Sequence, residues 1–189
     1  RKIVMEILEI VPGAVSAEVY ADRDTKAEDM AKQGREIARW DRRVVVKLPT
    51  TVEGFKARTL LRSESILTNN TLVFSQEQIY AICLHEEIIQ RTYQPQSMWP
   101  PFISPFVGRL EDQEFDGMDL VHQGMRLKKI FNSPLWMLEA SVRKVDDLKT
   151  GISLRSELIT APATVYREWF ALTEEEQHEK VILSDEEVL

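Results

Sequence analysis

Short β-type runs alternate with longer amphipathic stretches along most of the chain. Six runs rich in β-branched and aromatic residues predict strands at residues 14–20, 44–48, 67–74, 102–107, 135–142 and 158–161. Apolar residues at helical spacing predict helices at residues 3–10, 25–40, 51–61, 76–91, 117–131 and 164–172, with a short one from residue 146. Parallel strands need crossover helices of this kind. The pattern therefore predicts an α/β fold made of βα units.

Two architectures fit six strands separated by helices. A closed (β/α)8 TIM barrel has eight strands and about 250 residues, so the 189 residues would supply six of its eight βα units. The two remaining units would then precede Arg1. A doubly wound open sheet is the alternative, but it usually carries a G-x-G-x-x-G turn that this sequence lacks. We expect the barrel.

The C-terminal end of the chain differs from the rest. Thr173 and Glu176 have the spacing of a capping box, which predicts the start of a final acidic helix. We therefore expect an N-terminally incomplete barrel over residues 1–172 and an acidic helix or tail over residues 173–189.

Composition and charge narrow the functional classes. The formal net charge is -7, from 31 acidic and 24 basic residues, which disfavours nucleic acid as a partner. No apolar stretch approaches the ~20 residues of a membrane span, so no membrane partner is expected. The single cysteine, Cys83, cannot form an internal disulfide and indicates a reducing, cytoplasmic setting. The chain starts at Arg1 within an element already under way, which predicts a fragment.

Polar residues recur where the predicted strands end. Lys47 closes the run of residues 44–46, and Glu18 closes the run of residues 15–17. Three further strand ends carry polar or aromatic side chains at i and i+2, which face the same way: Asn69 and Thr71, Ser104 and Phe106, Ser141 and Arg143. Any one of these residues could simply be a solvated strand end or a turn cap. Five strands together indicate a site at the carboxyl edge of a sheet.

The motifs at these strand ends, taken in order, resemble those of transaldolase. They are Val-Ser-Ala-Glu-Val at 15–19, Lys-Leu-Pro-Thr-Thr at 47–51, Asn-Asn-Thr-Leu-Val-Phe-Ser at 69–75, Ser-Pro-Phe-Val-Gly-Arg at 104–109 and Ala-Ser-Val-Arg at 140–143. The resemblance spans residues 11–161. It implies a class I Schiff-base (β/α)8 barrel that uses no metal or organic cofactor.

The resemblance also implies roles for individual residues. Lys47 would attack the ketone of a ketose phosphate, and burial favours the neutral amine that such an attack requires. Glu18 would relay protons through a water held by Thr71. Asn69 and Ser104 would bind substrate hydroxyls. Arg109 and Arg143, with Ser141, would clamp the phosphate, because a guanidinium binds phosphate oxygens in pairs.

The implied activity is transfer of a dihydroxyacetone unit between sugar phosphates of the pentose phosphate pathway. Phe106 and Glu18 favour this transferase over fructose-6-phosphate aldolases, which tend to carry tyrosine and glutamine at these positions. A non-catalytic sugar-phosphate-binding or assembly protein is a further alternative, because the family's aspartate and Thr-Asn-Pro segment belong to the two units expected before Arg1. Asn70 departs from the family's usual apolar residue. We also expect a homo-oligomer.

Overall fold

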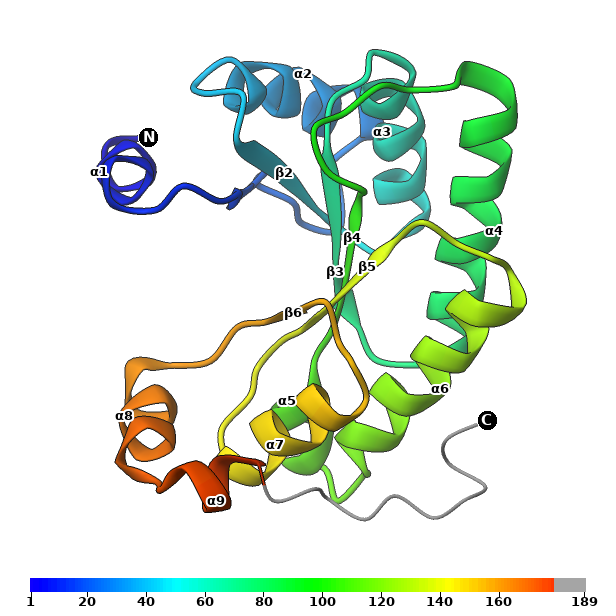
Figure 1. Ribbon diagram of the computed structural model, residues 1–189. Helices are drawn as coiled ribbons and strands as arrows, with labels where there is room; N and C mark the ends of the chain where they lie inside the picture. Colours follow the sequence, from blue (N-terminus) through cyan, green and yellow to red (C-terminus); the bar gives the residue numbers. More distant parts are fainter. Residues whose placement is uncertain (179–189) are drawn as a thin grey trace. The chain divides into compact units, whose positions relative to one another are not determined.

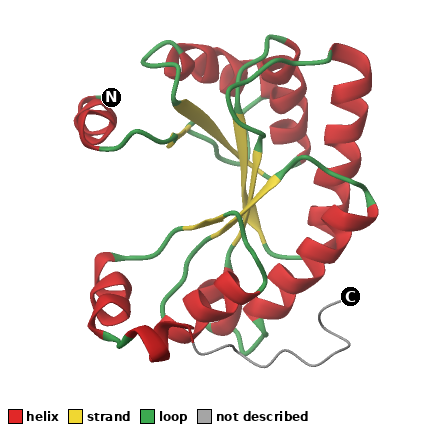
Figure 2. Ribbon diagram, viewed as in Figure 1, coloured by secondary structure: helices red, strands yellow, loops and turns green. Residues whose placement is uncertain are grey.

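The structure is a computed structural model that describes residues 1–178. These residues fall into two compact units. The first comprises residues 1–71 and 84–102, and the second comprises residues 72–83 and the described chain from residue 103 onward. Each unit is built from strands and helices that alternate along the chain (Figures 1 and 2).

The first unit contains the N-terminal βα elements. In chain order they are α1 (Lys2–Ile10), β1 (Val15–Glu18), α2 (Ala27–Ala38), β2 (Val44–Pro49), α3 (Val52–Ser63), most of β3 (Thr68–Val73) and the C-terminal part of α4 (Gln76–Tyr93). β1 pairs with β2 and β2 with β3, in both cases in parallel. Val44, Val45 and Val46 are all buried, as expected for a parallel strand covered on both faces.

The core of the first unit lies between its strands and helices α2 and α3. Met30, Val46 and Leu61 belong to one buried cluster. Gly34 permits this packing, because a Cβ at that position would lie 2.6 Å from Leu61 Cδ1. The small residue brings α2 close to the side chains of α3 and β2, which fixes the strand that contains Lys47.

The second unit contains the remaining elements. They are β4 (Phe102–Pro105, of which Phe102 belongs to the first unit), α5 (Val107–Glu111), α6 (Gly117–Ile130), β5 (Trp136–Glu139), α7 (Val145–Ser153), β6 (Leu158–Ile159), α8 (Ala163–Ala171) and α9 (Glu174–His178). β5 and β6 are parallel. Val142, Leu148 and Val165 form a core cluster beneath α7 and α8.

The strands occur in the sheet in chain order, from β1 to β6. This order and the helices between the strands confirm the predicted α/β class and six of the eight units of a (β/α)8 barrel. The capping box is also confirmed, because Thr173 N donates to Glu176 Oε2 at 2.8 Å and Glu176 N to Thr173 Oγ1 at 3.3 Å. The expected tail beyond residue 178 lies outside the described residues.

The main difference from the predicted elements concerns residues 102–107. The strand ends at Pro105, and a short helix, α5, starts at Val107. Val107 N donates to Ala140 O at 2.9 Å, and Gly108 N donates to Ser141 O at 3.1 Å. These contacts with the segment after β5 turn the chain out of the strand, and local sequence does not reveal them. The strand predicted at residues 135–142 likewise shortens to Trp136–Glu139.

Candidate active site

The nine residues predicted for the site fall into two groups, one in each unit. Lys47, Glu18, Asn69 and Thr71 belong to the first unit. The residues of the second unit are Ser104, Phe106, Arg109, Ser141 and Arg143.

Strand register places three of the first group side by side. Glu18 lies opposite Lys47 in the β1–β2 pair, and Lys47 lies opposite Asn69 in the β2–β3 pair. A shared row across parallel strands puts their side chains on one face of the sheet. The row lies near the carboxyl ends of β1 and β2, which end at Glu18 and Pro49.

Within this row the Lys47 amine contacts the Glu18 carboxylate, whereas the Asn69 amide contacts Ser16 of β1. Lys47 Nζ lies 3.5 Å from Glu18 Oε2, and Asn69 Nδ2 donates to Ser16 Oγ at 3.2 Å. The Lys47 side chain is 24% exposed, whereas that of Glu18 is 49% exposed. The amine is therefore largely sheltered but still accessible to a ligand, and a carboxylate that can exchange protons with it lies within reach.

Thr71 lies two positions further toward the carboxyl edge, opposite Pro49. Its carbonyl oxygen accepts from Thr50 N at 3.0 Å and from Thr50 Oγ1 at 2.8 Å. Its hydroxyl oxygen is buried and has no hydrogen-bond partner among the described residues. Because Thr71 is two residues beyond Asn69 in the strand, this hydroxyl faces the same side as the Lys47 row.

The turn after Lys47 is tightly built. Thr51 caps α3 by accepting from Gly54 N at 3.0 Å. A Cβ at Gly54 would lie only 1.9 Å from the carbonyl oxygen of Pro49. A glycine at this position therefore allows α3 to start directly over the end of β2, which holds the chain just after Lys47.

The second group is organised around β4 and α5. Ser104 is fully buried in β4. The Phe106 ring meets Phe74 edge to face, with 5.5 Å between centroids, and the guanidinium carbon of Arg109 lies 5.2 Å from the Phe106 centroid. A cation over an aromatic face at this distance is an attractive contact. Phe106 therefore supports Arg109 in the solvent-exposed position that a ligand could reach.

Ser141 and Arg143 follow β5 and lie against α5. Ser141 has a φ of 62°, an unusual conformation for a residue with a side chain. Its carbonyl oxygen accepts from Gly108 N. Arg143 Nη1 forms an ion pair with Asp112. The second group thus brings two guanidinium groups and a serine to one helix and the loop beside it, a set of donors suited to phosphate.

Sequence reasoning missed three features near the second group. Asp112 carries no local signal, because its partner Arg143 is 31 residues away. Glu139 is fully buried at the end of β5 although the surrounding residues read as an ordinary strand. The unit also contains a cavity of about 430 Å³, and none of the predicted site residues lines it. Its lining residues are Phe74, Ser75, Gln76, Glu77, Leu110, Phe115, Asp116, Asp119 and Leu120.

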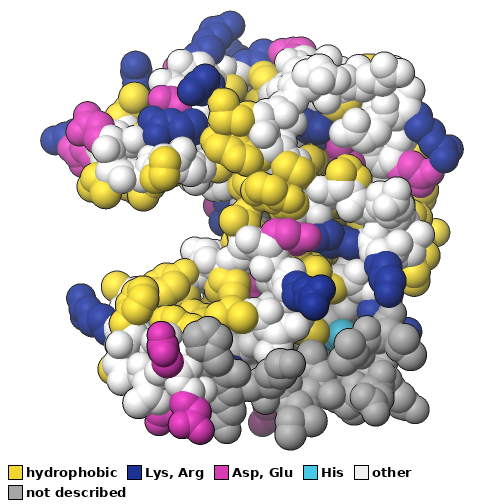
Figure 3. All heavy atoms as spheres, viewed as in Figure 1, with side chains coloured by type: hydrophobic (Ala, Val, Ile, Leu, Met, Phe, Trp, Pro, Cys, Tyr) yellow, Lys and Arg dark blue, Asp and Glu magenta, His cyan; other side chains and the backbone are white. Residues whose placement is uncertain are grey.

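Surface charge and metal ligands add little to this picture. On the face shown in Figure 3, Lys and Arg side chains are interspersed with acidic and apolar ones. Within residues 1–178, no group of three or more His, Cys, Asp or Glu side chains could hold a metal ion. None of the helices in the same residues is long and apolar enough to cross a membrane.

Comparison with known proteins supplies a family description. The family model described as "Transaldolase/Fructose-6-phosphate aldolase" matches residues 1–188. A protein of Lachnoclostridium phytofermentans named "Probable transaldolase" is 38% identical over 165 residues, which cover 87% of this chain and 70% of that protein. Proteins of the same name from Herpetosiphon aurantiacus and Lactiplantibacillus plantarum are 35% and 36% identical, over 89% and 87% of this chain and 69% and 68% of their own lengths.

Proposed function

Because the chain belongs to the transaldolase/fructose-6-phosphate aldolase family, we propose that it is a transaldolase that works through a Schiff base on Lys47. The substrates are ketose and aldose phosphates such as fructose 6-phosphate and sedoheptulose 7-phosphate. The reaction moves a dihydroxyacetone unit from one to the other, as in the pentose phosphate pathway.

The observation that carries this proposal is the row formed by Glu18, Lys47 and Asn69. A nucleophilic amine needs a nearby group that can accept and return protons, and Glu18 Oε2 lies 3.5 Å from Lys47 Nζ. Asn69 lies next to Lys47 on the side away from Glu18, where its amide can bind a substrate hydroxyl. A solvated lysine at the end of an isolated strand would have neither neighbour.

The proposed chemistry follows from this arrangement. Lys47 Nζ attacks the ketone carbon C2 of the donor, and loss of water gives an iminium. The C3–C4 bond then breaks, its electron pair moves toward the iminium, and the C4 hydroxyl proton passes to a general base. An aldose phosphate leaves, and a three-carbon enamine stays on Lys47. Attack of the enamine on a second aldose phosphate forms the new bond, and hydrolysis frees Lys47.

Water handling in this scheme falls to Glu18 and Thr71. The buried Thr71 hydroxyl, which has no partner among the described residues and faces the side of the Lys47 row, is suited to hold the water that leaves and returns. Glu18, half exposed beside the amine, is suited to move protons to and from that water.

The second group of residues would bind the phosphate end of the sugar. Arg109 and Arg143 provide charged, forked donors, and Ser141 lies beside them. Ser104, buried in β4, would contact a substrate hydroxyl. Phe106 cannot donate a proton, which favours transfer over simple aldol cleavage.

A product assay tests the proposal and separates it from aldolase activity. The protein is incubated with fructose 6-phosphate, with and without erythrose 4-phosphate as acceptor. We expect sedoheptulose 7-phosphate and glyceraldehyde 3-phosphate to form only with the acceptor. Release of free dihydroxyacetone at the same rate in both mixtures would instead make the protein an aldolase, and no turnover of bound sugar would favour a binding protein.

Three further expectations accompany this proposal. Assembly as a homo-oligomer, a cytoplasmic location and catalysis without metal or organic cofactor stay predictions. Dialysis against a chelator should leave the transfer rate unchanged if the last of them is right.

A further inference from the structure

The Arg143 side chain lies against helix α5 at Gly108. A Cβ at Gly108 would lie 2.9 Å from both Cγ and Cδ of Arg143 and 2.2 Å from the carbonyl oxygen of Ser141. Contacts this short do not occur with a real side chain, so the stem of Arg143 occupies the space that a larger residue at Gly108 would fill. The absence of a side chain at Gly108 lets Arg143 lie directly against the helix.

The guanidinium end of Arg143 is held one turn further along the same helix. Arg143 Nη1 pairs with Asp112 Oδ1, and Asp112 lies four residues after Gly108. Residues at this spacing share one face of a helix. Gly108 and Asp112 therefore contact the stem and the end of one arginine side chain.

Neighbouring residues attach the loop after β5 to the same helix. Lys144 Nζ lies 2.7 Å from Glu111 Oε2, one residue before Asp112. Arg109, on α5 itself, rests on Phe106 rather than on a carboxylate, and no ion pair to it occurs among the described residues. The two arginines thus differ: the phenyl ring supports one, and a carboxylate holds the other.

Two opposing effects of Asp112 on phosphate binding must be weighed. Its negative charge repels a phosphate near Arg143, but both side chains of the pair are about half exposed, at 47% and 53%, so water and salt screen this repulsion. In contrast, an arginine that is already ordered loses less conformational entropy when it binds. Asp112 also occupies only one of the five guanidinium N–H donors, which leaves others for phosphate oxygens. Ordering therefore outweighs repulsion.

We propose that Asp112 and Gly108 are positioning residues that hold Arg143 ready for the phosphate of the substrate, and so contribute to the preference for phosphorylated sugars. This inference rests on the proposed function, in which Arg143 binds that phosphate. Neither residue need touch the substrate, because both act through Arg143.

The test compares two variants that each remove one carboxylate from the end of α5. Asp112→Ala releases Arg143, whereas Glu111→Ala releases Lys144 and serves as the matched control. KM and kcat are measured with fructose 6-phosphate as donor and with erythrose 4-phosphate or unphosphorylated erythrose as acceptor. Dissociation constants for fructose 6-phosphate and fructose are measured by calorimetry, which does not depend on turnover.

We expect Asp112→Ala to raise KM and the dissociation constant for phosphorylated sugars by roughly 3- to 10-fold. Its kcat and the values for unphosphorylated sugars should stay near those of the unmodified protein. Asp112→Asn keeps an oxygen acceptor for Arg143 and should show a smaller rise. Glu111→Ala should leave all of these values nearly unchanged. In an Arg143→Ala background, Asp112→Ala should add no further loss, because the residue acts through that arginine.

Two results would overturn the inference. An unchanged or lowered KM in Asp112→Ala, together with a raised KM in Arg143→Ala, would leave the phosphate site intact and remove the role of Asp112. If Arg143→Ala itself bound phosphorylated and unphosphorylated sugars like the unmodified protein, the proposed phosphate site would fail and the inference with it.

Discussion

At the scale of single residues, Glu139 shows what a buried carboxyl costs. It ends β5 with no exposed surface, and neither carboxyl oxygen has a hydrogen-bond partner among the described residues. Burial, with smaller contributions from the charges of Asp147 and Glu111, raises the pKa of Glu139 from 4.5 to about 8. The carboxyl is therefore protonated at neutral pH in the folded state and ionised in the unfolded state.

This difference predicts how stability depends on pH. Between pH 4.5 and 8 the folded state holds a proton on Glu139 that the unfolded state has lost. The contribution of this proton to the free energy of unfolding is therefore fully present below pH 4.5 and is lost as pH rises to about 8. Each unit of pH in this window costs about 1.4 kcal/mol. Glu139→Gln should remove this dependence. Between pH 5.5 and 8, urea titrations should show the unmodified protein losing on the order of 3 kcal/mol more than the variant.

Parallel pH profiles for the two proteins would contradict the account of Glu139. The side chain has little room to rearrange, because a Cβ at Gly151 would lie 1.8 Å from Glu139 Oε2. A large relief of strain in Glu139→Gln is therefore not expected, and the pH-dependent part of the difference is the measurement that counts.

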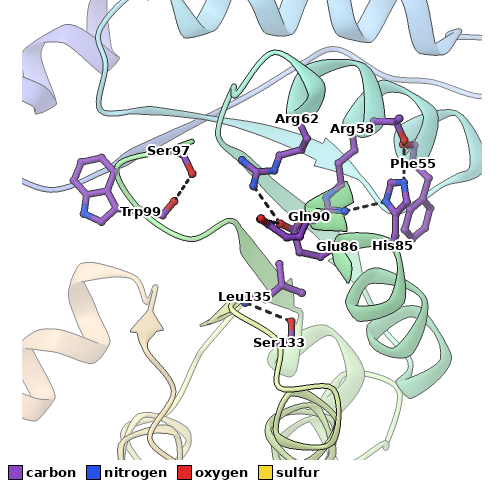
Figure 4. A network of polar contacts seen from close by, with 11 residues as sticks. Phe55, Arg58, Arg62, His85, Glu86, Gln90, Ser97, Trp99, Ser133 and Leu135 are labelled. Carbon is purple, nitrogen blue, oxygen red and sulfur yellow. Dashed lines mark hydrogen bonds and ion pairs between the residues drawn. The ribbon is translucent and has the colours of Figure 1, made fainter. Parts of the chain in front are cut away.

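At the scale of elements, buried polar contacts join α3 to α4 in the first unit (Figure 4). Glu86 on α4 forms ion pairs with Arg58 and Arg62 of α3, and all three side chains have at most 1% exposure. Gln90 Nε2 also donates to Glu86 Oε1 at 2.6 Å. One carboxylate thus pairs with two buried guanidinium groups, so the contact between the two helices depends on it.

His85 extends the same network. Its Nδ1 lies 2.9 Å from Arg58 Nη1, its Nε2 lies 2.9 Å from Thr59 Oγ1, and its ring meets Phe55 edge to face. Burial and the charge of Arg58 lower the pKa of His85 to about 4. The ring is therefore neutral at physiological pH, and its Nδ1 can accept a hydrogen bond from the guanidinium.

Removing the central carboxylate should destabilise the protein far more than removing an exposed one. Glu86→Gln removes the carboxylate that pairs with both Arg58 and Arg62 while their side chains stay buried, which costs roughly 3–5 kcal/mol. Glu64→Gln breaks the pair with Arg35, whose side chains are 42% and 36% exposed, and should cost no more than about 1 kcal/mol. Free energies of unfolding from denaturant titration check both values. Similar losses in the two variants would refute a special role for the buried network.

Elements with strong periodicity could be predicted from the sequence, whereas those fixed by distant contacts could not. The run of valines before Lys47 and the helical spacing of residues 76–91 identified β2 and α4 with small boundary errors. Helix α5 was missed because its start depends on bonds to Ala140 and Ser141. Asn70 was recognised as a departure from the family pattern. The structure buries its amide, which has no hydrogen-bond partner among the described residues.

The candidate site shows the same division. Spacing of two correctly placed Asn69 and Thr71 in β3, where pleating puts them on one face. It was wrong for the other two pairs, because β4 ends at Pro105 and β5 at Glu139. It could not reveal that Glu18 and Lys47 share a row, since register is set between strands. It also could not reveal Asp112, whose ion pair joins α5 to the loop after β5. Contacts between segments far apart in the sequence leave no periodic signal in either segment.

At the scale of the whole molecule, family membership and the two groups of site residues support one chemistry. The first unit presents an amine beside a carboxylate, and the second presents two guanidinium groups on and beside one short helix. An acidic protein, with a net charge of -7, that binds anionic sugars needs its cations placed locally. Under the proposed function, Arg109 and Arg143 would supply those cations within the second unit.

The central claim is that Lys47 is the amine that forms the covalent intermediate. The direct measurement is borohydride reduction of the protein in the presence of fructose 6-phosphate, followed by peptide mass mapping, with Lys47→Arg as the negative control. We predict a reduced three-carbon or hexose phosphate adduct on the peptide that contains Lys47, and no adduct in the variant. An adduct on a different lysine, or none under conditions of turnover, would contradict the assignment.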